Sequence, residues 1–68
     1  MKRRDVIVFW LDGTKTTFPA VRIKSMIVND EEGKVATLGF KFGKNGHVAT
    51  INLDNIKFFE VTKTCTED

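Results

Sequence analysis

Few side chains in this sequence have the types and spacing that enzymatic chemistry requires. His47, Ser25 and Cys65 are the only residues of their kinds, and there is no tyrosine. His47 follows a glycine at the mouth of a predicted hairpin and Cys65 lies near the end of the chain, so their positions imply no paired nucleophile and base. The acidic residues 30–32 are consecutive, which does not match the ligand spacing of a calcium loop. We therefore predict a protein that is not an enzyme and holds no metal or cofactor.

The residues best suited to binding chemistry are Trp10 and Lys15, which the predicted first hairpin places on one face. An indole can stack on a planar ring and an ammonium group can neutralise a phosphate, as nucleotides and single-stranded nucleic acids require. A lysine stem lying over a tryptophan is also ordinary sheet packing or a subunit contact. Four further cations are possible anion contacts: Arg3, Arg4, Lys41 and Lys44.

The formal charge of +2 comes from the two ends of the chain. Residues 5–62 contain seven cations and seven anions, whereas residues 2–4 are all basic. A broad basic surface of the kind that binds nucleic acid is therefore not evident from the composition.

The hydrophobic pattern alternates with period two and is interrupted by Gly, Asn and Asp, which predicts strands joined by tight turns. Residues 6–11 and 14–18 form a hairpin around the two-residue turn Asp12-Gly13. Its register places Ile7, Phe9, Leu11 and Phe18 on one face, and Val6, Val8, Trp10 and Lys15 on the other. Pro19 marks a break or an edge position, and residues 20–28 form the next strand.

A second hairpin joins residues 34–42 to residues 47–53, through either a two-residue turn at Asn45-Gly46 or a four-residue turn at residues 43–46. The two turns differ in register by two residues and leave the faces unchanged. Its core face contains Ala36, Leu38, Phe40, Phe42, His47, Ala49, Ile51 and Leu53. Residues 56–62 form the last strand, in which Phe58 and Phe59 point to opposite sides. The fold class is thus predicted to be all-β: a small five- or six-stranded antiparallel meander that forms a barrel or a sandwich.

The 68 residues are enough for one domain. We predict a basic N-terminal arm at residues 1–4, a β domain at residues 5–62 and a polar tail at residues 63–68. The longest apolar run, residues 6–11, is far shorter than the roughly 20 residues of a membrane helix. The basic start lacks the apolar stretch and cleavage site of a secretory signal, which favours a cytoplasmic protein without membrane contacts.

The first strand is apolar on both faces, although so thin a β domain has only one interior. Either this strand is central in a tightly curled barrel, or the face with Val6, Val8 and Trp10 contacts a second subunit or a ligand. Either Phe58 or Phe59 also requires cover from outside. We therefore expect the functional unit to be larger than one chain.

Two resemblances follow from short motifs. Residues 8–13, Val-Phe-Trp-Leu-Asp-Gly, resemble the strand and turn of Sm-like RNA-binding rings. Asp12-Gly13-Thr14, together with the Asn-Leu-Asp-Asn-Ile of residues 52–56 and the Phe and Glu after it, resembles small uncharacterised β proteins of bacteriophages and prophages. This resemblance implies an accessory protein of the host cytoplasm that blocks a host protein or sequesters a nucleotide signal.

The leading hypothesis from the sequence is a self-associating, non-enzymatic β module that binds a host protein or a small anionic ligand. Its surface would be Val6, Val8, Trp10 and Lys15. The alternative is a nucleic-acid or nucleotide binder, for example of cyclic dinucleotides, in which Trp10 stacks and lysines contact phosphate.

Overall fold

A computed structural model describes residues 2–67 of the chain, with side chains described for residues 3–63. It contains six antiparallel strands in two three-stranded sheets, together with two 3₁₀ turns. The strands are β1 (Lys2–Trp10), β2 (Lys15–Arg22), β3 (Ile27–Asn29), β4 (Thr37–Phe42), β5 (His47–Asn52) and β6 (Ile56–Glu67); the turns are η1 (Ile23–Ser25) and η2 (Leu53–Asn55). The predicted all-β class is confirmed.

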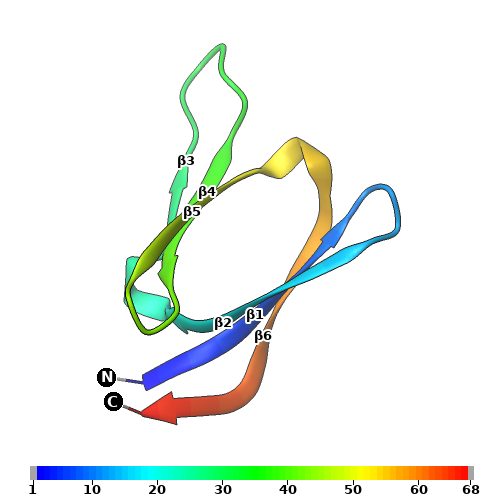
Figure 1. Cartoon of the computed structure of the whole chain (residues 1–68). Helices are drawn as coiled ribbons and strands as arrows, with labels where there is room; N and C mark the ends of the chain where they lie inside the picture. The colour runs from blue at the N-terminus through cyan, green and yellow to red at the C-terminus, as the bar shows by residue number, and fades with distance from the viewer. Residues whose placement is uncertain (1, 68) are drawn as a thin grey trace.

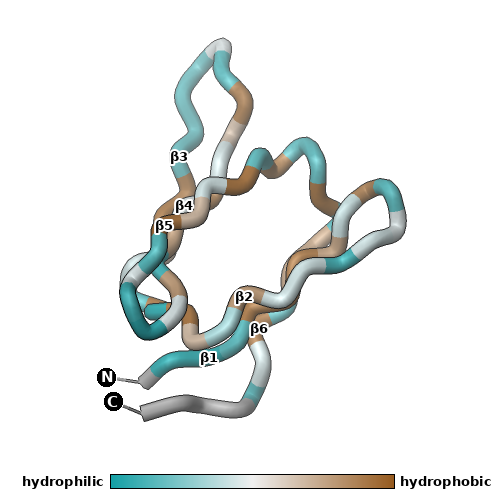
Figure 2. The backbone as a smooth tube through the Cα atoms, in the orientation of Figure 1, coloured by the Kyte–Doolittle hydropathy of each residue, from teal (hydrophilic) through white to brown (hydrophobic). Residues whose placement is uncertain are grey.

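The sheets have the strand orders β2-β1-β6 and β3-β4-β5 (Figure 1). Strand pairing among the described residues does not join them into a closed barrel. Hydrophobic residues gather in the middle of β1, β4 and β5, and hydrophilic residues predominate in the loop between β3 and β4 (Figure 2). The fully or almost fully buried core side chains are Val6, Val8, Val21, Leu38, Phe40 and Ile51.

The ends of the domain differ from the prediction. Strand β1 already begins at Lys2, and β6 continues to Glu67, whose backbone lies opposite Lys2. Residues 2–4 of the predicted arm therefore pair with residues 65–67 of the predicted tail. Met1 and Asp68 lie outside the described residues.

The β1–β2 turn is one residue longer than predicted. Strand pairs such as Val8–Thr16 and Phe9–Lys15 leave Leu11, Asp12 and Gly13 as the loop. The backbone N–H of Trp10 donates to the Thr14 carbonyl at 2.9 Å. Gly13 has a φ of +91°, as expected for the left-handed position that closes a three-residue hairpin loop.

Side chains alternate between the two faces of a strand. One extra loop residue therefore places the Val6 side of β1, and not the Ile7 side, on the same face as Phe18 of β2. Val6 and Val8 are fully buried, and Trp10 packs against the core. Ile7 and Phe9 instead lie half-buried on the outer face. The expectation that the face with Val6, Val8 and Trp10 awaits an external partner is therefore wrong, since the chain itself covers it.

An irregularity in β1 and β2 links the two sheets. Asp5 lies opposite the pair Pro19–Ala20, so the register shifts between Arg4 and Val6. Asp5 Oδ1 accepts the backbone N–H of Ala20 at 3.1 Å, and Ala20 has a φ of +50°. The Pro19 carbonyl accepts the N–H of Gly43 from the β4–β5 turn at 3.0 Å. Pro19 lies in an edge strand, as its missing N–H favours.

The second hairpin has the predicted faces, and its register is that of the four-residue turn, one of the two turns that the sequence allows. Leu38 pairs with Ile51, and Phe40 pairs with Ala49. Leu38, Phe40 and Ile51 are buried. Phe18 of β2 meets Phe40 in an edge-on contact with ring centroids 5.1 Å apart, which packs one sheet against the other.

The strand predicted at residues 20–28 is divided by η1. Ser25 explains this break, because its hydroxyl donates to the Arg22 carbonyl at 2.6 Å and accepts the Lys41 N–H at 2.8 Å. These two bonds close the 3₁₀ turn and attach it to β4.

Candidate functional site

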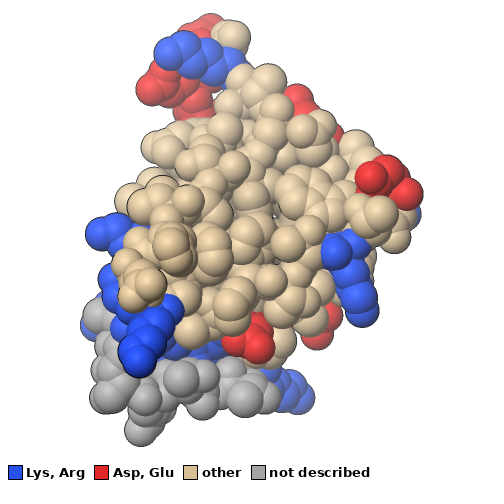
Figure 3. All heavy atoms as spheres, in the orientation of Figure 1, with Lys and Arg blue, Asp and Glu red and all other residues tan. Residues whose placement is uncertain are grey.

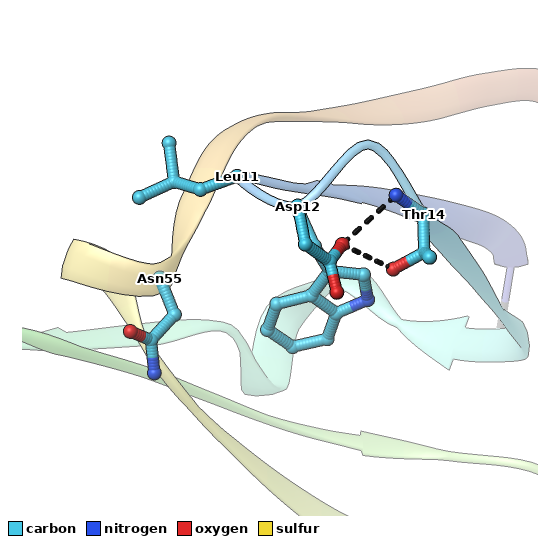
Figure 4. A pocket seen from close by; sticks show the side chains of 5 residues that line it. Leu11, Asp12, Thr14 and Asn55 are labelled. Atoms are coloured by element: carbon cyan, nitrogen blue, oxygen red, sulfur yellow. Dashed lines mark hydrogen bonds between the residues drawn. The ribbon is translucent and has the colours of Figure 1, made fainter.

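A shallow cavity of about 380 Å³ lies beside the β1–β2 turn. Its lining residues are Trp10, Leu11, Asp12, Thr14 and Asn55 (Figure 4). The Leu11 N–H donates to the Asn55 carbonyl at 3.0 Å, which fixes the turn against η2. The cavity thus combines one aromatic side chain with polar groups from two chain segments.

Trp10 and Lys15 do not form the predicted pair. Lys15 lies opposite Phe9 in the register and therefore points to the outer face, whereas Trp10 packs on the core side. The indole Nε1–H donates to Thr16 Oγ1 at 2.9 Å. Trp10, which was predicted to stack on a ligand, and Lys15, which was predicted to contact its phosphate, consequently lie on opposite faces of the sheet.

Asp12 sets the charge at the rim of this cavity. Its Oδ1 accepts the Thr14 hydroxyl at 2.6 Å and the Thr14 N–H at 2.9 Å (Figure 4). The hydroxyl bond, followed by the backbone bond, lowers the pKa of Asp12 below its ordinary value of 3.8. The carboxylate remains ionised at neutral pH and opposes a phosphate beside Trp10. This rim is better suited to a hydrogen-bond donor or a cation.

The cations predicted as anion contacts are distributed over two strands and a turn. Arg3 is buried in β1, with 8 % of its surface exposed, and Arg4 is half-buried. Lys41 in β4 and Lys44 in the β4–β5 turn are exposed. Figure 3 shows several Lys and Arg side chains near the end of the molecule that carries this turn, and others on the opposite side and in the loop between β3 and β4.

Sequence reasoning missed Arg22. It lies directly opposite Arg3 in the β1–β2 register, so the two side chains share a face. Arg3 and Arg22 face each other only because the register shifts at Asp5, which lies opposite both Pro19 and Ala20. The sequence signal for this shift is Pro19, where a break or an edge position was predicted. Arg22 belongs with Arg3 and Lys44 at the β4–β5 turn.

Strand β6 forms one edge of the sheet β2-β1-β6 and carries exposed aromatic residues. Phe58 is 54 % exposed and Phe59 is 39 % exposed. Phe58 stacks on Phe9 of β1 with ring centroids 4.5 Å apart, on the outer face. Phe59 pairs with the buried Val8 and thus lies on the inner face. The prediction that the two rings point to opposite sides is confirmed.

Other kinds of site receive no support from the described part of the chain. Within it, His, Cys, Asp and Glu side chains nowhere gather in the groups of three or more that could hold a metal ion. None of the described helices is long and apolar enough to cross a membrane.

The chain matches no protein-family model, and comparison with curated proteins and with solved structures finds no significant similarity.

Proposed function

We propose that this protein is a non-enzymatic binding module that works as a homodimer joined along the free edge of β6. The observation that carries the proposal is the exposure of three large apolar side chains on this one edge strand. They are Phe58, Phe59 and Val61, each more than a third exposed.

The four edge strands differ in how well they could accept a partner strand. Strand β3 has only three residues, and β5 has six. Strand β2 contains Pro19, which has no N–H, and the Pro19 carbonyl already bonds to Gly43. Strand β6 has twelve residues and is the longest of the four. A long apolar edge is a template for strand pairing, so β6 is the edge best suited to a second chain.

A second copy is the occupant that this edge favours. Antiparallel pairing of β6 with its own copy, about a two-fold axis perpendicular to the sheet, would form one closed interface and a continuous six-stranded sheet. Such an axis keeps each face on its own side. Placing Phe58 opposite its symmetry mate would extend the Phe9–Phe58 stack into a row of four rings. Aromatic cross-strand pairs stabilise sheets, which favours this register.

The biological role that we propose is the one expected from the sequence. A domain with so few reactive side chains acts by binding, and the resemblance to small phage and prophage proteins favours an accessory protein that occupies a host protein or a small ligand. The cytoplasmic location remains a prediction.

The proposal is tested by sedimentation equilibrium of the wild-type chain and two charge variants. Phe58→Glu should dissociate the dimer. Burying the exposed half of two phenylalanine rings contributes about 3 kcal/mol, which corresponds to at least a hundredfold weaker association. Val48→Glu is the matched control, because Val48 is 70 % exposed on the other sheet and should leave the dimer intact.

Loss of the Phe9–Phe58 stack needs its own control. Phe9→Leu removes the stack without placing a charge on the edge strand, so this variant should still dimerise, and circular dichroism should confirm that all variants are folded. A wild-type chain that stays monomeric at high micromolar concentration would refute the proposal. Equal dissociation of the Val48→Glu variant would refute the assignment to β6.

A further inference from the structure

The hydrogen-bond donors of two lining residues of the cavity beside the β1–β2 turn are already used within the chain. The hydroxyl and the backbone N–H of Thr14 both donate to Asp12 Oδ1, at 2.6 Å and 2.9 Å. The indole N–H of Trp10 donates to Thr16 Oγ1 at 2.9 Å. A ligand that bonds to these residues would therefore have to supply the donors itself.

Acceptor oxygen atoms remain at the same cavity. Both bonds from Thr14 end on Oδ1 of Asp12, so Oδ2 is left for a further donor. The Thr14 hydroxyl directs its hydrogen at Asp12 and keeps its lone pairs, and the Asn55 carboxamide contributes another acceptor. Figure 4 shows the Asp12 and Asn55 side chains extending to the same side of the turn, whereas the Leu11 side chain points away. The lining thus suits a donor-rich ligand.

The Asp12 carboxylate gives the cavity a negative charge that its surroundings do not neutralise. No cation of residues 3–63 forms an ion pair with it. Lys15 and Lys57 are close to the lining segments in sequence, but neither side chain lines the cavity. Asp54 in η2 is exposed and adds a second negative charge to this part of the chain. The charge therefore favours a cation as the ligand.

Trp10 adds an aromatic surface to the same cavity. It packs against the core, and its N–H is bonded to Thr16, so the indole is held in place and offers its ring to a ligand. Aromatic rings attract cations, and tryptophan does so most strongly. We propose that the cavity lined by Trp10, Asp12, Thr14 and Asn55 binds the alkylammonium group of a small organic cation. Its volume of about 380 Å³ is sufficient for a small molecule.

This alkylammonium site goes beyond the proposed dimer. Its lining includes none of the three apolar side chains of the β6 edge, so each copy of the chain contains a whole site and a monomer should bind the same cation. The ligand is opposite in charge to the anionic ligand expected from the sequence. The reason is the register of the first hairpin, which places the Asp12 carboxylate, and not the Lys15 ammonium, beside Trp10.

The proposal is tested by recording the N–H NMR signals of the wild-type chain at neutral pH while butylammonium chloride or neutral butanol is added, with sodium chloride as the blank. Butylammonium should shift the Trp10 indole signal and the Thr14 amide signal until they saturate. Butanol has the same chain without the charge and should leave both signals nearly unchanged. Butyltrimethylammonium, which keeps the charge and has no N–H, should bind more weakly than butylammonium. Equal effects of butanol and butylammonium would overturn the proposal, because they would show apolar contact alone.

Asp12→Asn separates the charge from the structure of the turn, because the asparagine oxygen can still accept both bonds from Thr14. This variant should bind butylammonium about threefold to fivefold more weakly, as expected on loss of an exposed charge pair. Asp30→Asn is the matched control, since Asp30 is an exposed carboxylate in the loop between β3 and β4. It should bind as the wild type does. Equal weakening by the two variants would overturn the proposal, because it would show diffuse attraction to negative charge.

Asn55→Asp tests the site in the opposite direction. It places a second carboxylate on the lining and should strengthen the binding of butylammonium about twofold or more. Signals of Trp10 and Thr14 that do not respond to butylammonium at high millimolar concentration would overturn the proposal, whether or not the chain dimerises. A monomeric chain that binds butylammonium would refute the dimer and support the alkylammonium site, so the two proposals fail separately.

Discussion

Replacement of Val8 by threonine tests which face of β1 forms the core. Val8 is fully buried, and threonine has nearly the same shape, so Val8→Thr changes the polarity of the site without opening a cavity. A buried hydroxyl without a partner costs about 1–3 kcal/mol. In a domain of this size each kcal/mol lowers the melting temperature by about 4–8 °C. We therefore expect melting about 8–16 °C below wild type for a cost of about 2 kcal/mol.

Thermal unfolding followed by circular dichroism measures this shift. Val48→Thr is the control, because it makes the same chemical change in another strand at a side chain that is 70 % exposed. Its stability should stay within about 0.5 kcal/mol of wild type. With the two-residue turn at Asp12-Gly13, Val8 would lie on the uncovered face and its substitution would be neutral. A Val8→Thr variant that melts with the wild type would thus refute the three-residue loop and the core built on it.

Two further substitutions address the turn and the irregular strand pair. Thr14→Val should raise the pKa of Asp12 toward its ordinary value of 3.8, since the Thr14 hydroxyl is the main cause of the lowering. Because the folded-state pKa of Asp12 is lowered, its stabilising effect is present above the unfolded pKa and is lost as pH falls through the folded value. The variant should therefore lose less stability on acidification; an unchanged pKa in an NMR titration would contradict this. Ala20→Gly should stabilise the chain by about 0.5–1 kcal/mol, because relief of the left-handed strain at φ +50° exceeds the entropy cost of glycine. Urea unfolding measures this gain, and destabilisation would indicate that the alanine is not strained.

The second hairpin shows what the sequence could predict. Its turn allowed loops of two or four residues, and both place Leu38, Phe40 and Ile51 on the same face, because an even change in loop length preserves side-chain alternation. Its outer face also contains polar residues, such as Thr50 and Asn52, so the pattern itself distinguishes inside from outside. The inner and outer faces of this hairpin therefore follow from the sequence with either loop, whereas the register is that of the four-residue loop, in which Phe42 pairs with His47.

Neither condition holds for the first hairpin: its possible loops differ by an odd number of residues, and its first strand has no polar face. A three-residue loop differs from a two-residue loop by an odd number, and this difference moves Phe18 from the face of Ile7 to the face of Val6. Both faces of β1 are apolar, so the hydrophobic pattern does not identify the inner one. Asp12-Gly13 is compatible with either loop, because Gly13 has a positive φ in both. Only tertiary packing against the second sheet selects the observed register.

The same odd shift changes which surface of the sheet we propose as the partner interface. With Val6 and Val8 in the core, the apolar character of β1 that suggested a second subunit is largely satisfied within the chain. What remains uncovered is the outer face, where Phe9 meets Phe58, and the adjoining edge of β6. The sequence shows that β1 is apolar on both faces. The additional loop residue places Ile7 and Phe9, and not Val6 and Val8, on the outer face of the sheet. The proposed partner surface is therefore centred on Phe58, which is 54 % exposed, and not on Trp10.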